Sequence, residues 1–163
     1  MKDGNRKKGL SLVEMLFYVA MMVLLLDVLV RMSAAMLGAY RDIKVSKNIE
    51  SAAVSAMERM TRDIRNASAS TATSSSAEIT LTESSAPTSV RFYVSSSTLR
   101  VDENASYAGP LTPAGVAVSS LVFRNIATAK SQGVKIEMTL SETLGAISHT
   151  RNFYDTVELR GSL

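Results

Sequence analysis

The chain has 163 residues, enough for one small globular domain, and a formal net charge of +3. The absence of cysteine excludes disulfides, thiolate metal sites and cysteine nucleophiles. Four of the 18 basic and one of the 15 acidic side chains lie in residues 1–9, so the remainder carries 14 of each. The excess positive charge therefore belongs to the N-terminus, and it gives no argument for direct nucleic acid binding.

Residues 10–30 read LSLVEMLFYVAMMVLLLDVLV, an apolar run whose only charged side chains are Glu14 and Asp27. As a helix, this run would be about 30 Å long, which matches the hydrocarbon core of a bilayer. A basic cluster in front of it favours a cytoplasmic N-terminus, although Arg31 and further basic residues on the far side are a counter-signal. The sequence therefore predicts a single-pass segment in the cytoplasmic membrane, with the remaining chain outside. The basic cluster consists of Arg6, Lys7 and Lys8.

The position of Glu14, four residues inside the apolar run, separates two interpretations of this segment. An uncompensated carboxylate at that depth is costly, so it requires a partner. An ordinary secretory signal peptide, cleaved near the small residues Ser33–Ala35, has no use for such a group but stays an alternative. In that alternative, the chain would be a secreted or membrane-anchored β-rich binding domain. Asp27 is expected to pair with Arg31 on the same helix face, with an inter-subunit contact inside the membrane as the alternative.

Residues 7–16 read KKGLSLVEML. This segment resembles the type III signal of type IV prepilins and pseudopilins: a short basic leader that ends in Gly, an apolar first mature residue and Glu at the fifth mature position. Leu10 and Ser11 depart from the Phe and Thr that are most frequent there. The resemblance implies that a prepilin peptidase cuts between Gly9 and Leu10 and methylates the new amine with S-adenosylmethionine. It also implies that Glu14 pairs with the N-terminal amine of a neighbouring subunit, mainly to set the register of assembly.

Helical periodicity continues beyond the membrane segment and predicts one helix from Leu10 to about Ala67. Gly38 is a soft point in this helix, because Gly weakens a helix by about 1 kcal/mol relative to Ala. Apolar residues recur beyond it on an arc of about 100°, which predicts that residues 31–67 form an amphipathic half that packs on a domain. The residues of this arc are Ile49, Ala53, Ala56, Met57, Met60 and Ile64.

Charged side chains of the same helix lie away from the apolar arc. Glu58 with Arg62, and Arg59 with Asp63, are spaced by four residues, so each pair can form an ion pair along the helix. Such pairs contribute a few tenths of a kcal/mol each when they are exposed. We expect this run of charges to be a solvated face.

Residues 68–77 contain only Ser, Thr and Ala, and they are predicted to form a linker. Alternation of apolar and polar residues then predicts a β domain over residues 78–163. The run 103–115, with two Pro and two Gly, is the longest predicted loop. Since no helical stretch separates the strands, we expect one antiparallel sheet whose apolar face lies on the helix. The predicted strands contain residues 79–81, 90–94, 99–101, 116–123, 134–140 and 153–159.

Together, these elements predict an α+β fold, with a long N-terminal helix packed on a C-terminal antiparallel β-sheet, as in pilins. Residues 60–67 (MTRDIRNA) and 156–160 (TVELR) resemble the J-type minor pseudopilins and PilW-type minor pilins. The resemblance implies a structural, minor subunit of a type IV pilus or of a type II secretion or competence pseudopilus, active in filament assembly or initiation. The implied partners are the prepilin peptidase/N-methyltransferase, other pilins or pseudopilins, an assembly ATPase, a platform protein and the lipid bilayer. A major pilin is the alternative within the family.

Few residues offer any other chemistry. His149 is the only histidine and cannot form a zinc site alone, so a surface position is expected. Asp102–Asn104 offers oxygen ligands for calcium, but adjacent side chains point in different directions and a solvated turn is favoured. The sequence contains no glycine-rich phosphate loop and no G-x-S-x-G turn. We therefore expect no enzymatic activity, no cofactor and no metal.

Overall fold

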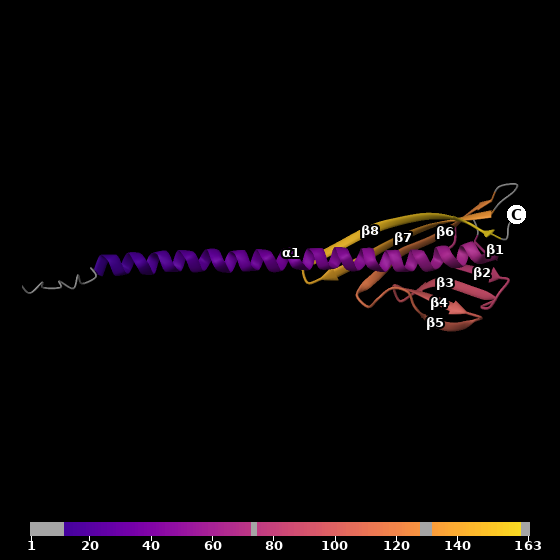
Figure 1. The fold of residues 1–163 in the computed structure, drawn as a ribbon, viewed down its shortest axis with the longest axis horizontal. Coiled ribbons are helices and arrows are strands. Elements are labelled where there is room, and N and C mark those ends of the chain that lie inside the picture. Colours follow the sequence, from indigo (N-terminus) through magenta and orange to yellow (C-terminus); the bar gives the residue numbers. More distant parts are fainter. Residues whose placement is uncertain (1–11, 73–74, 128–131, 161–163) are drawn as a thin grey trace, which may run out of the picture. The chain divides into compact units, whose positions relative to one another are not determined.

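The computed structural model describes residues 12–72, 75–127 and 132–160. Over these ranges the chain forms one helix, α1 (Leu12–Asn66), and eight strands, as Figure 1 shows. The chain divides into two compact units, Met1–Tyr40 and Arg41–Leu163. The helix α1 therefore contributes its first part to one unit and its second part to the other.

The first sheet of the second unit has five antiparallel strands in the order β1-β2-β3-β4-β5. Two of its hairpins turn through only two residues, Ser96–Ser97 between β3 and β4 and Asn104–Ala105 between β4 and β5. All four residues have φ angles between 51° and 64°, which is the conformation of a type I′ hairpin turn. The strands are β1 (Ala67–Ser70), β2 (Ile79–Glu83), β3 (Ser89–Ser95), β4 (Thr98–Glu103) and β5 (Ser106–Pro110).

The second sheet has three longer antiparallel strands in the order β6-β7-β8. These strands are β6 (Val116–Ala127), β7 (Gln132–Leu144) and β8 (Ile147–Glu158). Alternate side chains of β7 are buried, as the sequence predicts for its clearest strand. The buried side chains include Val134, Ile136, Met138 and Leu140.

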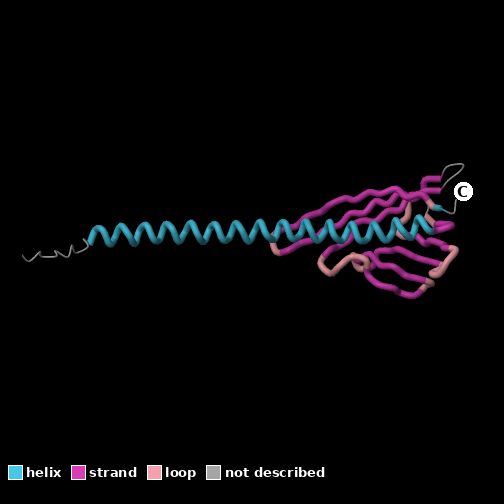
Figure 2. Tube along the Cα trace, viewed as in Figure 1, coloured by secondary structure: helices cyan, strands magenta, loops and turns pink. Residues whose placement is uncertain are grey.

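The second part of α1 packs between the two sheets. In Figure 1, β6 to β8 lie along one side of it and β2 to β5 along the other, and Figure 2 shows the same strands in magenta beside the cyan helix. Phe92 of β3 and Phe123 of β6 are the largest side chains in the shared core. The predicted apolar arc faces this core, except that Met57 is only partly buried, and the α+β fold class is confirmed. The buried apolar helix residues are Val45, Ile49, Ala52, Ala53, Ala56, Met60 and Ile64.

The strands form two sheets, whereas the sequence predicts one. Strand β5 lies inside the predicted loop 103–115 and ends the first sheet, and β6 pairs with β7 instead. The strands β6 to β8 have 12 or 13 residues, but those of the first sheet have four to seven. Strands of such unequal length cannot satisfy each other's backbone groups along their full length, so two ladders are favoured. A backbone hydrogen bond from Val118 N to Ser97 O (2.7 Å) joins the two sheets.

The predicted linker also differs from its sequence-based description. Its first residues belong to β1, which pairs with β2 through partners such as Ser70 and Leu81. Ser76 forms an isolated bridge with Phe123, with backbone bonds of 2.9 and 2.7 Å. Ser, Thr and Ala show no apolar alternation, so the tertiary pairing with β2, rather than local preference, makes this strand.

Candidate membrane and assembly segment

The part of α1 in the first unit carries exposed apolar side chains around its whole circumference. The six consecutive residues 21–26 are all large and apolar, and each is about half exposed or more. Successive helix residues are rotated by about 100°, so six of them cover every side. Among the described residues, this helix is the one that is long and apolar enough to cross a membrane, as an anchor or as a signal sequence. Lipid or other proteins must cover so large an apolar surface.

Glu14 is the one residue assigned to processing or assembly that lies within the ranges described by the structure. Its side chain lies on the exposed surface of α1, between the exposed apolar residues Val13 and Met15. The predicted roles of Glu14 and of the cleavage site stay predictions. The other assigned residues lie outside the described ranges: Arg6, Lys7, Lys8, Gly9 and Leu10.

Two further polar side chains of this segment, those of Arg31 and Ser33, form hydrogen bonds within the helix itself. Arg31 donates from Nε to Asp27 Oδ2 at 2.8 Å, which confirms the ion pair that the sequence predicts. Ser33 donates from Oγ to the backbone oxygen of Leu29 at 2.9 Å. These bonds satisfy polar groups that would otherwise be costly to place in an apolar environment such as lipid.

Near the end of α1, a charge cluster connects the helix to β4. Arg59 donates to Asp63 Oδ2 and to Glu103 Oε1, each at 2.6 Å. The hydrogen bond to Asp63 is the main cause that raises the pKa of Arg59 above its ordinary value. The charges of this cluster also act on Glu83 of β2. Its pKa is raised above the ordinary value, mainly by burial and secondly by the negative charge of Asp63. Asp63 is itself buried, so the expectation of a solvated face is wrong for Arg59 and Asp63.

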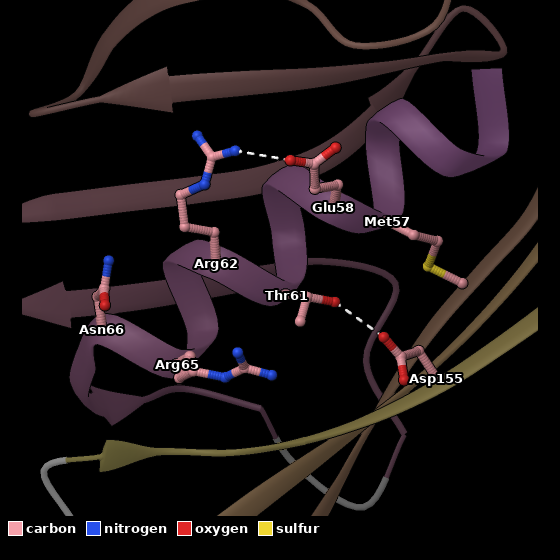
Figure 3. Close-up of a pocket in the computed structure, with 7 residues that line it drawn as sticks. All are labelled: Met57, Glu58, Thr61, Arg62, Arg65, Asn66 and Asp155. Atoms are coloured by element: carbon pink, nitrogen blue, oxygen red, sulfur yellow. Dashed lines mark hydrogen bonds and ion pairs between the residues drawn. The ribbon is translucent and has the colours of Figure 1, made fainter. Parts of the chain in front are cut away.

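In contrast, the neighbouring pair of Glu58 and Arg62 is exposed, as predicted, with an N–O distance of 3.0 Å. Figure 3 shows this pair beside a groove of about 480 Å³ between α1 and β8. Across the groove, Thr61 donates to Asp155 Oδ2 at 2.9 Å. Four of the polar side chains that line the groove therefore bond to each other in two pairs, Glu58 with Arg62 and Thr61 with Asp155.

Further polar contacts hold β8 along the helix. Arg151 donates to Glu50 and to Ser46 Oγ, the latter at 2.9 Å. His149, which the sequence predicts at the surface, is only partly exposed, and its Nε2 lies 2.6 Å from Asp42 Oδ1. Sequence reasoning missed these contacts because polar residues occupy the helix-facing side of β8 and hide its alternation. Their spacing of two along the strand was the available signal.

The three residues that the sequence offers as calcium ligands, Asp102 to Asn104, each form a hydrogen bond with a different group of the protein. Asp102 accepts a hydrogen bond from Tyr93 Oη at 3.1 Å, and Glu103 accepts one from Arg59. Asn104 Oδ1 accepts from the backbone nitrogen of Thr88 at 3.0 Å. Within the ranges that the structure describes, no three His, Asp or Glu side chains are grouped to hold a metal ion.

Comparison with known proteins adds no family: no family model, no curated protein and no solved structure matches the chain. A long apolar N-terminal helix whose second part packs on antiparallel sheets is consistent with a pilin-like architecture.

Proposed function

We propose that this chain is a structural subunit of a type IV pilus or of a type II secretion or competence pseudopilus. In this proposal it is a minor subunit that takes part in filament assembly or initiation. The observation that carries the proposal is the apolar first part of α1, exposed on every side, in the same helix whose second part packs on antiparallel sheets. Such a helix suits lipid before assembly and the helices of other subunits afterwards.

The proposed mechanism is packing rather than catalysis. The precursor waits in the cytoplasmic membrane as a single-pass protein with its β domain outside. Cleavage after Gly9 removes the basic leader and creates a new amine at Leu10. A charged side chain at the centre of a membrane helix costs roughly 2.5–3.5 kcal/mol, and in this proposal the pairing of Glu14 with the amine of a neighbour offsets part of the cost of its charge in lipid. Assembly thereby becomes favourable in one register.

The proposed partners follow from the same mechanism. A prepilin peptidase that is also a methyltransferase prepares the N-terminus, and an assembly ATPase with its platform protein supplies the work of extraction from the membrane. The described polar clusters of this chain support a structural role, because Arg59 and Arg151 are engaged in holding the helix to the sheets. We therefore propose no enzymatic activity and no cofactor.

Mass spectrometry of the mature N-terminus in the native cell tests this proposal. A chain that starts at methylated Leu10 supports it, and a start near Met36, as a signal peptidase would produce, overturns it. Two glycines of the leader provide matched variants. Gly9→Leu places a side chain at the scissile bond and should abolish processing, whereas Gly4→Leu should leave processing unchanged. A minor subunit should also be present at a few copies per filament, and its deletion should reduce the number of filaments.

A further inference from the structure

Strand β8 is an edge strand, and among the described strands β7 is its single neighbour. The two strands keep one register over the whole length of β8, and just beyond it Leu159 donates from its backbone nitrogen to Gln132 O at 2.8 Å. Backbone groups of alternate residues point to opposite sides of a strand, so the odd-numbered residues of β8 face β7 and the even-numbered ones face outward. The N–H and C=O groups of Thr150, Asn152 and Tyr154 therefore lie on an open edge.

The next outward amide along this edge, that of Thr156, already has a partner. It donates to Asp155 Oδ1 at 2.8 Å, and Asp155 Oδ2 accepts from Thr61 of α1. Asp155 thus ends the open part of the edge and connects it to the helix. An exposed and regular edge is a template for a further strand, and β8 has neither a proline nor a bulge that would prevent such pairing.

Two adjoining hollows continue from the open edge toward the end of α1. The first is the groove of about 480 Å³ between α1 and β8 in Figure 3. The second has a volume of about 740 Å³ and is lined by residues 156–160 and by Arg65 of α1. Arg65 lines both hollows, and in Figure 3 it extends from the helix on the same side as Thr61, toward β8. A helix and an edge strand with a groove between them can hold an extended peptide.

The charges of the second hollow indicate what its occupant must carry. Arg65 and Arg160 line it and are both exposed, and Glu158 is the carboxylate of the same lining. Across the described ranges, no ion pair involves any of these three side chains. Two cations against one carboxylate leave a positive charge in excess. A guanidinium group binds a carboxylate through two parallel hydrogen bonds, so an occupant with an acidic side chain fits beside Arg65.

We propose that the open edge of β8 and the two hollows beside it bind an extended, acidic peptide segment of another protein. The segment adds a fourth strand to the second sheet, because its backbone exchanges hydrogen bonds with Thr150, Asn152 and Tyr154. An acidic side chain of the segment pairs with Arg65. The backbone bonds give affinity, and the contact with Arg65 selects the charge. This site lies in the second unit, so the inference goes beyond the proposed filament function and does not depend on it.

Peptide titration of the full-length chain in detergent tests the inference. The probe is a fluorescent synthetic peptide with blocked ends that alternates Val and Thr and carries an Asp near each end. The comparison peptide has Lys in place of both Asp residues. We expect the Asp peptide to bind roughly tenfold more tightly in fluorescence anisotropy, since its carboxylate pairs with Arg65. Equal binding of the two peptides, or no binding of the Asp peptide, would overturn the proposal.

The variant Tyr154→Pro tests pairing through the strand edge. Proline removes the outward N–H and leaves the bonds to β7 in place, whereas the matched control Tyr154→Thr removes the exposed ring and keeps the N–H. We expect the Asp peptide to bind Tyr154→Pro several-fold more weakly than Tyr154→Thr. In the natural chain, the bound peptide should slow hydrogen exchange at the amides of Thr150, Asn152 and Tyr154. Unchanged exchange at these amides would overturn strand pairing, even if the proline variant fails to fold.

Charge reversal tests the selection by Arg65. We expect Arg65→Glu to reverse the preference, so that the Lys peptide binds more tightly than the Asp peptide. Arg41→Glu makes the same change of charge at an exposed cation of α1 that lines neither hollow, and it should keep the preference of the natural chain. The same shift in both variants would overturn the role of Arg65. Self-association of the natural chain that Tyr154→Pro abolishes would overturn the assignment to another protein, because a second copy would then occupy the edge.

Discussion

The charge cluster around Arg59 allows a stability prediction whose size follows from the geometry. Arg59 bonds to both Asp63 and Glu103, and the negative charges of these two residues also act on Glu83. The change Arg59→Met keeps an unbranched apolar stem but removes the guanidinium group, with its charge and donors. Three carboxylates are then left together at the end of α1, and one of them, Asp63, is buried.

The expected loss is about 2 kcal/mol in the free energy of unfolding. Removal of one partner of a fully buried ion pair costs about 3–5 kcal/mol. Here, solvent screens part of the interaction, because the side chains of Arg59 and Glu103 are 34% and 36% exposed, whereas that of Asp63 is 10% exposed. For a domain of this size, the loss corresponds to a fall in Tm of roughly 6–10 °C.

Thermal unfolding of the full-length chain in detergent, followed by circular dichroism of the β domain, measures this loss. Hydrogen exchange should locate the weakening at the end of α1 and at β4. The matched control is Arg62→Met, which breaks the neighbouring i, i+4 pair with Glu58. Both side chains of that pair are at least 60% exposed, so its loss should cost less than about 0.5 kcal/mol.

A rescue variant separates charge from packing. Adding Asp63→Asn to Arg59→Met removes the buried unpaired carboxylate, so we expect it to recover part of the lost stability. Equal, small losses in Arg59→Met and Arg62→Met would refute the reasoning, because burial of Asp63 would then have no energetic effect.

Three other predictions concern the titration of the cluster and the membrane segment. Because the pKa of Glu83 is raised in the fold, its charged form is disfavoured, so Glu83→Gln should raise Tm at pH 7 and lose this advantage in melts below the ordinary carboxylate pKa of 4.5. Arg31→Leu leaves Asp27 unpaired and should lower the membrane-inserted level several-fold in blots of membrane fractions, whereas adding Asp27→Leu should restore it. Glu14→Ala should still be cleaved but should fail in methylation or incorporation, and its normal presence in sheared filaments would remove the role assigned to Glu14.

The part of the fold that depends on local periodicity could be predicted from the sequence. The helix ends at Asn66, one residue from the predicted end, because the apolar arc and its charges extend that far. Strand β7 and the ion pair of Asp27 with Arg31 were also predictable, since each depends on neighbours at a fixed spacing. The cleavage site and the role of Glu14 depend on a sequence resemblance and stay predictions.

Contacts between distant segments were decided by the tertiary structure alone. Pairing with β2 makes a strand of the Ser-rich residues after α1, and the unequal strand lengths divide the sheet in two. Helix packing buries Asp63 beside Arg59 and aligns Arg151 with Glu50, whereas the local spacing of these residues indicates neither the burial of Asp63 nor the partner of Arg151. The physical reason is the same in each case. Local pattern determines which face of an element is apolar, but a polar residue on that face is stable only when folding brings a distant partner to it.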